Sequence, residues 1–219
     1  MAARQNGAHM GSLSRRAFLI AAGLWPAAAM AQKHQKPAPR QSQPSLSAAR
    51  SIMAGAPLSV LLGNVPRGAR LAIARPDDPA DKAIVVFELK NMVPALPTPG
   101  AVGTYELRLM VEKDGAPTVL LRQPLATTEP SATLAAPERI SRGQGLPVRG
   151  IGPNGEQDRV ILVKPDAPAD ADGPRFFPAE NVEATLEAPD QPGVYELRYI
   201  LHAPLAENRI LARRAVRVE

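Results

Sequence analysis

The sequence predicts an all-β chain that contains two tandem β-sandwich domains. Three observations support this prediction: short segments alternate apolar and polar residues, one unit of sequence occurs twice, and 24 prolines and 16 glycines punctuate the 219 residues. Proline breaks helix interiors, and strands that recur every ~8–12 residues between turn residues are typical of sandwiches and small barrels. A hydrophobic fraction of 45% with 21% charged residues indicates a globular protein.

The clearest alternation lies near the C-terminus. Between residues 193 and 201, Tyr195 and Leu197 fall on one face and Glu196 and Arg198 on the other, which is the period of a half-buried strand. We expect further strands at residues 58–62, 71–74, 84–89, 105–112, 118–125, 133–135, 148–151, 159–163, 182–186 and 210–218.

The repeated unit is recognised by three matches whose offsets drift slowly, from 89 to 91 residues. A tandem duplication explains such a series, and repeats decide architecture. The matching segments are 72–81 with 161–170, 104–109 with 194–199, and 120–122 with 211–213. We therefore place one domain at residues 51–128 and the other at residues 131–219.

Residues 1–31 have the features of a cleaved export signal. The letters SRRAFL, which contain Arg15 and Arg16, resemble the twin-arginine (Tat) export motif of bacteria. The apolar stretch at 17–29 is shorter than the ~20 residues that span a bilayer. A small-x-small site predicts cleavage after Ala31. The resemblance implies a periplasmic protein whose mature chain has no transmembrane span.

The positive charge is concentrated before the domains. Of the 26 Lys and Arg, three lie in residues 1–31 and four in residues 32–50, which leaves 19 against 21 Asp and Glu in 51–219. Residues 32–50 are rich in Pro, Gln and Ser and are predicted to form a disordered tether. The near-neutral domains argue against a nucleic-acid partner. Either Met1 or Met10 is the start of translation.

A tyrosine near the beginning of a strand is expected to act structurally in each copy. Tyr195 follows the turn at 190–193, and Tyr105 takes the equivalent place, as in the tyrosine corner of immunoglobulin-like sandwiches, where the hydroxyl bonds back to the main chain. The string TLEAPDQPGVYELRYIL, followed by ILARRAVRV, resembles immunoglobulin-like repeats of bacterial exported proteins, including some with von Willebrand A domains. The resemblance covers most of 146–218 and, more weakly, 58–127. It implies a sandwich fold and no particular chemistry.

Side chains that could catalyse a reaction are scarce. The chain has no Cys, and after export its only histidines are His34 and His202. This composition offers neither a nucleophile with its base nor a transition-metal site. We therefore expect a protein that is not an enzyme and has no cofactor.

Acidic residues cluster in one loop of each copy. In the second copy Asp166, Asp170 and Asp172 are candidates for Ca²⁺ ligands, because Asp-rich loops with Gly supply oxygen atoms for this ion. The alternative is a solvated turn. The first copy has Lys82 where the second has Ala171, which weakens a shared metal role.

The same loop of the second copy leads into Arg175, Phe176 and Phe177, which we predict to be a contact tip for a protein partner. The alternative is that one Phe packs inward. The leading hypothesis is a non-enzymatic periplasmic interaction or accessory module with a protein partner. The alternative function is a ligand-binding or Ca²⁺-dependent module for envelope polysaccharide.

Overall fold

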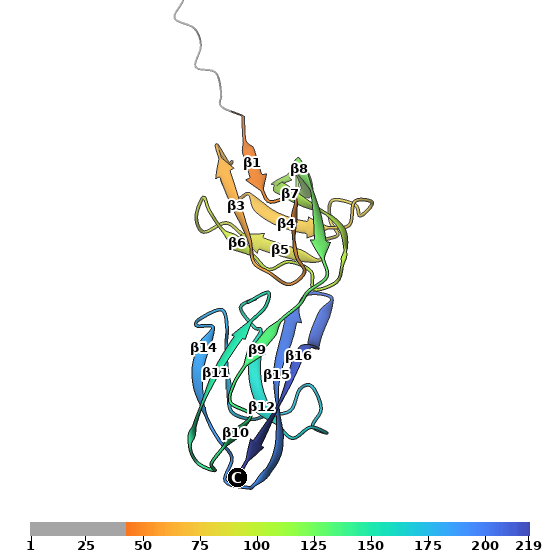
Figure 1. The fold of residues 1–219 in the computed structure, drawn as a ribbon. Helices are drawn as coiled ribbons and strands as arrows, with labels where there is room; N and C mark the ends of the chain where they lie inside the picture. The colour runs from red at the N-terminus through yellow and green to blue at the C-terminus, as the bar shows by residue number, and fades with distance from the viewer. Residues whose placement is uncertain (1–42) are drawn as a thin grey trace, which may run out of the picture. The chain divides into compact units, whose positions relative to one another are not determined.

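The computed structural model describes residues 43–219, and all regular secondary structure in that range is β (Figure 1). The first sandwich packs the three-stranded sheet β1-β3-β6 against the five-stranded sheet β2-β8-β7-β4-β5. The all-β prediction is confirmed. The strands are β1 (Ser45–Ala48), β2 (Ser51–Met53), β3 (Leu58–Gly63), β4 (Arg70–Ala74), β5 (Val85–Glu88), β6 (Ala95–Leu96), β7 (Gly103–Lys113) and β8 (Ala116–Thr128).

The second sandwich repeats this topology strand for strand. Its sheets have the orders β14-β11-β9 and β10-β16-β15-β12-β13, and in both sandwiches a short strand pairs in parallel with the last long strand. The tandem immunoglobulin-like architecture follows from this repeated order. The strands are β9 (Thr133–Ala135), β10 (Arg139–Ile140), β11 (Gly145–Ile151), β12 (Arg159–Val163), β13 (Arg175–Phe176), β14 (Glu183–Glu187), β15 (Gly193–Ala203) and β16 (Ala206–Val218).

The first sandwich begins earlier than the sequence predicted. Ser45–Ala48 form β1 and pair antiparallel with β3, whereas the sequence predicts a disordered tether for residues 32–50. Leu46 and Ala48 alternate with serines and pack against the core, so this segment buries enough apolar surface to be a strand. Residues 32–42, the Tat motif at Arg15 and Arg16, and the cleavage site after Ala31 lie outside the described residues.

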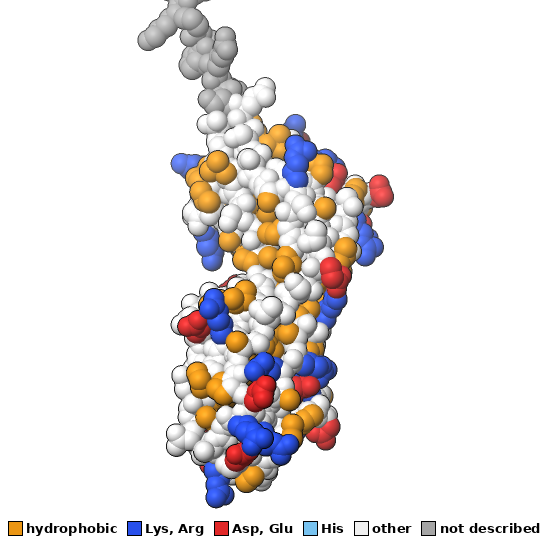
Figure 2. Space-filling view, in the orientation of Figure 1, with side chains coloured by type: hydrophobic (Ala, Val, Ile, Leu, Met, Phe, Trp, Pro, Cys, Tyr) orange, Lys and Arg blue, Asp and Glu red, His pale blue; other side chains and the backbone are white. Residues whose placement is uncertain are grey.

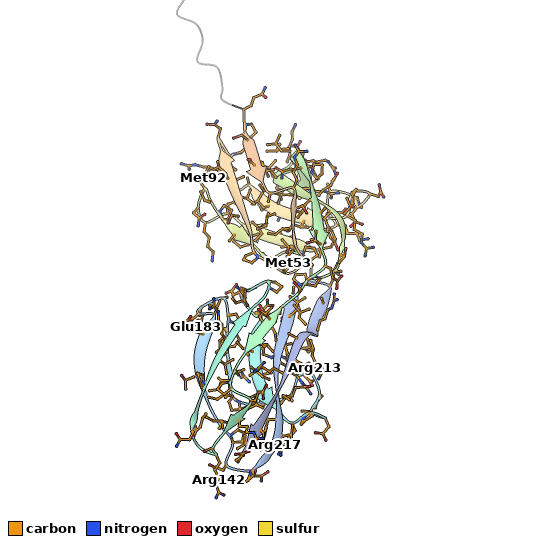
Figure 3. The ribbon with its side chains drawn as sticks, viewed as in Figure 1. Met53, Met92, Arg142, Glu183, Arg213 and Arg217 are labelled. Carbon is orange, nitrogen blue, oxygen red and sulfur yellow. The ribbon has the colours of Figure 1, made fainter. Side chains whose placement is uncertain are left out.

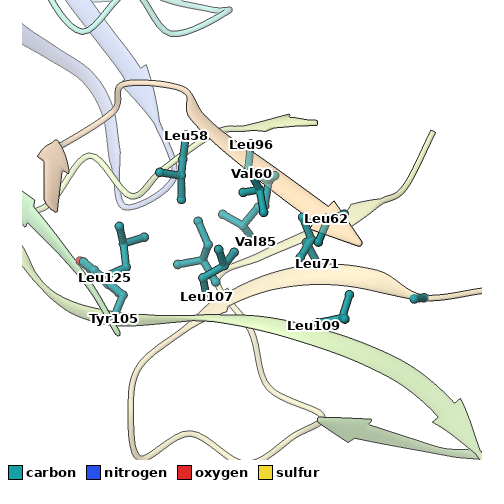
Figure 4. Packing of buried hydrophobic residues seen from close by; sticks show 12 residues of the cluster. Leu58, Val60, Leu62, Leu71, Val85, Leu96, Tyr105, Leu107, Leu109 and Leu125 are labelled. Carbon is teal, nitrogen blue, oxygen red and sulfur yellow. The ribbon is translucent and has the colours of Figure 1, made fainter. Parts of the chain in front are cut away.

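Each sandwich encloses its own apolar core. Figure 4 shows the first one, in which Leu58, Leu96 and Leu107 meet between the two sheets and are at most 1% exposed. In the second core, Leu146, Leu197 and other inward residues of β11 and β15 pack in the same way. Among residues 43–219 no helix is long and apolar enough to cross a membrane.

The two tyrosines make the bonds of a tyrosine corner. The Tyr195 hydroxyl donates to the carbonyl oxygen of Gln191 at 3.0 Å, and the Tyr105 hydroxyl donates to that of Ala101 at 3.1 Å. Both rings are nearly buried. Each hydroxyl therefore fastens the turn that leads into its own strand.

An arginine on the outer face of each five-stranded sheet is buried under a loop. Arg198 is 1% exposed. Its guanidinium donates to the carbonyl oxygens of Ala167 at 2.6 Å and Pro165 at 2.7 Å, and its Nε donates to Glu196 Oε2 at 2.5 Å. Two weaker bonds reach the carbonyl oxygens of Pro168 and Lys164. The loop that follows β12 thus folds over the sheet and is fastened by one side chain.

The first sandwich uses the same device. Arg108 is fully buried and donates to the carbonyl oxygens of Asp78, Arg75 and Pro79 at 2.7–3.0 Å, and to Glu106. The repeated sequences RPDDPAD and KPDAPAD therefore have the same structural role in the two sandwiches. Their main chains supply the acceptors for the arginine of the repeated YELR sequence.

Candidate interaction surface

The predicted contact tip lies at an edge of the second sandwich. Arg175 and Phe176 form β13, which is the last strand of the five-stranded sheet and pairs with Ile161 and Val160 of β12. Phe176 packs against the core. Phe177 is 37% exposed. The pair thus divides into one structural and one exposed ring, and only Phe177 offers an apolar contact to a partner.

A pocket of about 310 Å³ opens beside Phe177. Four residues nominated from sequence line it: Asp170, Asp172, Arg175 and Phe177. His202, which the sequence did not nominate, also lines it. The fold thereby gathers residues from the loop after β12, from β13 and from β15. Sequence reasoning also did not nominate the lining residues Gln157, Arg159 and Ala171. Asp166 is not among the residues that line the pocket.

Charges around the pocket are mostly paired or fastened. Arg175 Nη1 lies 2.5 Å from Asp172 Oδ1. Arg159 donates to Asn208 Oδ1 at 2.8 Å and to the carbonyl oxygen of Ala169 at 3.2 Å. Burial, and then the positive charge of Arg175, lower the pKa of the Arg159 guanidinium. The pocket is therefore mixed in charge, with two guanidinium groups and two carboxylates around one exposed ring.

The Asp loops do not assemble an oxygen cage. Within residues 43–219 no three His, Asp or Glu side chains gather where they could hold a metal ion. Asp172 pairs with Arg175, and in the first copy Lys82 Nζ lies 2.9 Å from Asp78 Oδ1, which lowers the pKa of Asp78. The loops serve instead as the acceptors of the buried arginines. The assignment of Asp166, Asp170 and Asp172 as Ca²⁺ ligands therefore stays a prediction.

His202, which lines the pocket, joins a buried polar network. Its main-chain N–H donates to Asp158 Oδ1 at 2.9 Å, while Tyr199 Oη and the main-chain N–H of Gly155 donate to Asp158 Oδ2 at the same distance. The His202 Nδ1 atom is buried and has no partner in the described part of the chain. Burial raises the pKa of Asp158 and of Tyr199. Asp158 is fully buried, so it acts on the loop that it fastens rather than on a ligand.

The face of the second sandwich that Figure 2 presents has no field of a single charge sign. In Figure 2, basic and acidic side chains are interspersed over the second sandwich. The ion pairs Arg213–Glu196 and Arg139–Glu219 illustrate this mixture. The described side chains on this face therefore do not form the one-sided basic field that attracts a polyanion.

Comparisons with known proteins return structures and no family. No family model and no curated protein matches the sequence. The Yersinia pseudotuberculosis adhesin InvE is 18% identical with a TM-score of 0.27, over 82% of this chain and 59% of that one. The human OSCAR ligand-binding domain is 16% identical with a TM-score of 0.28, over 80% of this chain and 97% of that one. The chicken CNTN1 FN1–FN3 domains are 8% identical with a TM-score of 0.31, over 79% of this chain and 66% of that one.

Proposed function

We propose that the chain is an exported, non-enzymatic interaction module, and that the edge of the second sandwich around Phe177 contacts a partner protein. The observation that carries the proposal is the exposed Phe177 ring beside a pocket of mixed charge at the end of an edge strand. An aromatic anchor surrounded by polar groups is the usual composition of a protein contact. The described residues that line the pocket include no Cys, Ser, Thr or Lys that could serve as a nucleophile.

A photo-crosslinking experiment tests the contact. The full chain carries p-benzoylphenylalanine at position 177 and is irradiated in the cells that export it. We expect one discrete adduct of higher mass. The matched control places the same group at Leu120, which is exposed to nearly the same extent, 36% against 37%. Equal labelling from both positions, or no adduct from position 177, contradicts the proposed contact.

Export is the second part of the proposal, and the arginine pair predicts its route. The double substitution Arg15→Lys and Arg16→Lys preserves charge, yet the Tat motif that these residues resemble requires arginines. We expect the variant to remain in the cytoplasm with residues 1–31 attached, whereas the parent chain is recovered from the periplasm beginning at Gln32. Fractionation followed by intact mass measurement checks this. Unchanged export of the double-lysine variant would rule out the Tat route.

A further inference from the structure

The two copies treat one sheet edge differently. In the first sandwich the edge strand β6 contains only Ala95–Leu96 and lies between Pro94 and Pro97. In the second, the equivalent edge strand β14 spans Glu183–Glu187 and contains no proline. Short edges and prolines are common ways in which proteins prevent an edge from pairing with another strand. The second copy lacks this protection.

The main chain of β14 presents free groups on its outer side. Gly150 N–H donates to the carbonyl oxygen of Val182, and Ala188 N–H donates to that of Gln144, both at 2.9 Å. Since the pairs of an antiparallel ladder alternate, residues 182, 184, 186 and 188 direct their main-chain groups toward β11. The residues between them direct theirs outward.

Three residues of β14 therefore face the open edge. The N–H of Glu183 is already bonded to Asn181 Oδ1 at 3.1 Å. The N–H and carbonyl groups of Thr185 and Glu187 have no partner among residues 43–219. An added strand would complete these bonds, which is how extended peptides bind to sheet edges.

The charge of this edge selects the kind of strand that would add to it. Residues 180–190 contain four acidic residues and no Lys or Arg. Glu183 lies on β14 (Figure 3) and is opposed only by an exposed Arg149 at 3.4 Å, while Glu187 has no ion pair within the described range. A second copy that paired antiparallel about Thr185 would set Glu183 opposite Glu187, and like charges directly opposite are destabilising. The occupant is therefore a cationic strand and not another copy of this chain.

We propose that β14 accepts an extended segment of a partner protein in which two Lys or Arg stand four residues apart. The two cations, at the first and fifth residues of the segment, lie opposite Glu187 and Glu183. Apolar residues at its second and fourth positions lie on the same face of the sheet as Leu186, which is buried in the core. The inference rests on the proposed function, because β14 borders β13 and the segment would belong to the same partner.

A synthetic peptide with the core Lys-Val-Thr-Val-Lys, labelled with a fluorophore, is the probe. We expect it to bind the full chain, to bind more weakly as salt increases, and to protect the Thr185 and Glu187 amides from hydrogen exchange. A peptide with Glu in place of both Lys, and one with Pro in place of Thr, should not bind.

Two variants separate main-chain pairing from charge. Thr185→Pro removes an outward N–H, keeps both acids and fits an edge strand, so we expect it to weaken binding about tenfold or more with the melting temperature unchanged. Glu187→Gln keeps the N–H and should reduce binding and its salt dependence, whereas the matched control Glu112→Gln on the first sandwich should change neither. Equal binding by Thr185→Pro overturns the inference. The inference is also overturned if position 177 gives a cross-linked adduct but the peptide does not protect the Thr185 amide from hydrogen exchange. That combination of results would leave the proposed function intact.

Discussion

Substitution of Arg198 by methionine is expected to lower the free energy of unfolding of the second sandwich by about 3 kcal/mol or more. The change preserves most of the aliphatic stem and removes a buried guanidinium that donates to four main-chain carbonyl groups and to Glu196. Removal of a buried charged donor leaves its acceptors without partners, and each such group costs about 1–3 kcal/mol. The loop 164–171 should then open, which exposes the small apolar cluster of Ile161, Val163 and Ile200 beneath it.

Arg213 supplies a matched control for this experiment. It pairs with the same carboxylate, Glu196 Oε2, at 2.5 Å but is 50% exposed, so Arg213→Met should cost less than about 1 kcal/mol. Urea unfolding measures the difference, and hydrogen exchange of the amides at 164–171 locates it. Equal losses for the two variants would show that Arg198 is no more than a second surface partner of Glu196. Arg198→Lys should not restore stability, because an ammonium cannot replace a planar fork of five donors.

For the buried arginines, the sequence predicts the face of the strand on which they lie but not the loop that covers them. Alternation places Glu196 and Arg198 together on the face opposite Leu197, and the structure has them there. Period two reports which face a side chain occupies, but it does not report that a loop from elsewhere covers that face. The signal was nevertheless present, since the Pro-Asp loops and the YELR strands are repeated with nearly the same offset. Two segments that are retained together in both copies are candidates for mutual contact.

The contact surface was less accessible to prediction for a related reason. The residues Asp170, Asp172, Arg175 and Phe177 lie close in sequence, so their proximity in space could be expected. Arg159 comes from the preceding strand and lines the pocket only because β12 pairs with β13. The open edge of β14 likewise exists because β14 is the last strand of its sheet and no described strand pairs with its outer side. Such features follow from sheet order, which local alternation does not encode.

Asp158 marks a chemical difference between the two copies, and Asp158→Ala is expected to lower the free energy of unfolding by about 3 kcal/mol. The carboxylate accepts from the main-chain N–H groups of Gly155 and His202 and from the Tyr199 hydroxyl. A buried donor that loses its acceptor costs about 1–3 kcal/mol, and some of this loss is recovered because Tyr199 can still donate to Asn154 Oδ1. Thermal and urea unfolding measure the effect.

The pH dependence of this site has a definite sign. Burial raises the pKa of Asp158 above its ordinary value of 3.8, so the folded chain retains this proton to higher pH than the unfolded chain does. The stability that the carboxyl contributes is complete below the unfolded pKa and is lost as pH rises through the folded pKa. The amide of the variant Asp158→Asn does not titrate, so the advantage of the parent chain over this variant should be greatest in acid and should shrink toward neutral pH. A constant or widening difference contradicts the assignment.

The first sandwich provides the test of why this network exists. There Ala69 and Leu109 occupy the places of Asp158 and Tyr199, since Leu109 pairs with Leu71 as Tyr199 pairs with Val160. Both are buried apolar residues. A double variant, Asp158→Ala with Tyr199→Leu, should lose less stability than the two single variants combined, because each single variant alone already removes the hydrogen bond between Tyr199 and Asp158. If the losses simply add, the two groups act independently, and the polar network is not the unit that holds this loop in place.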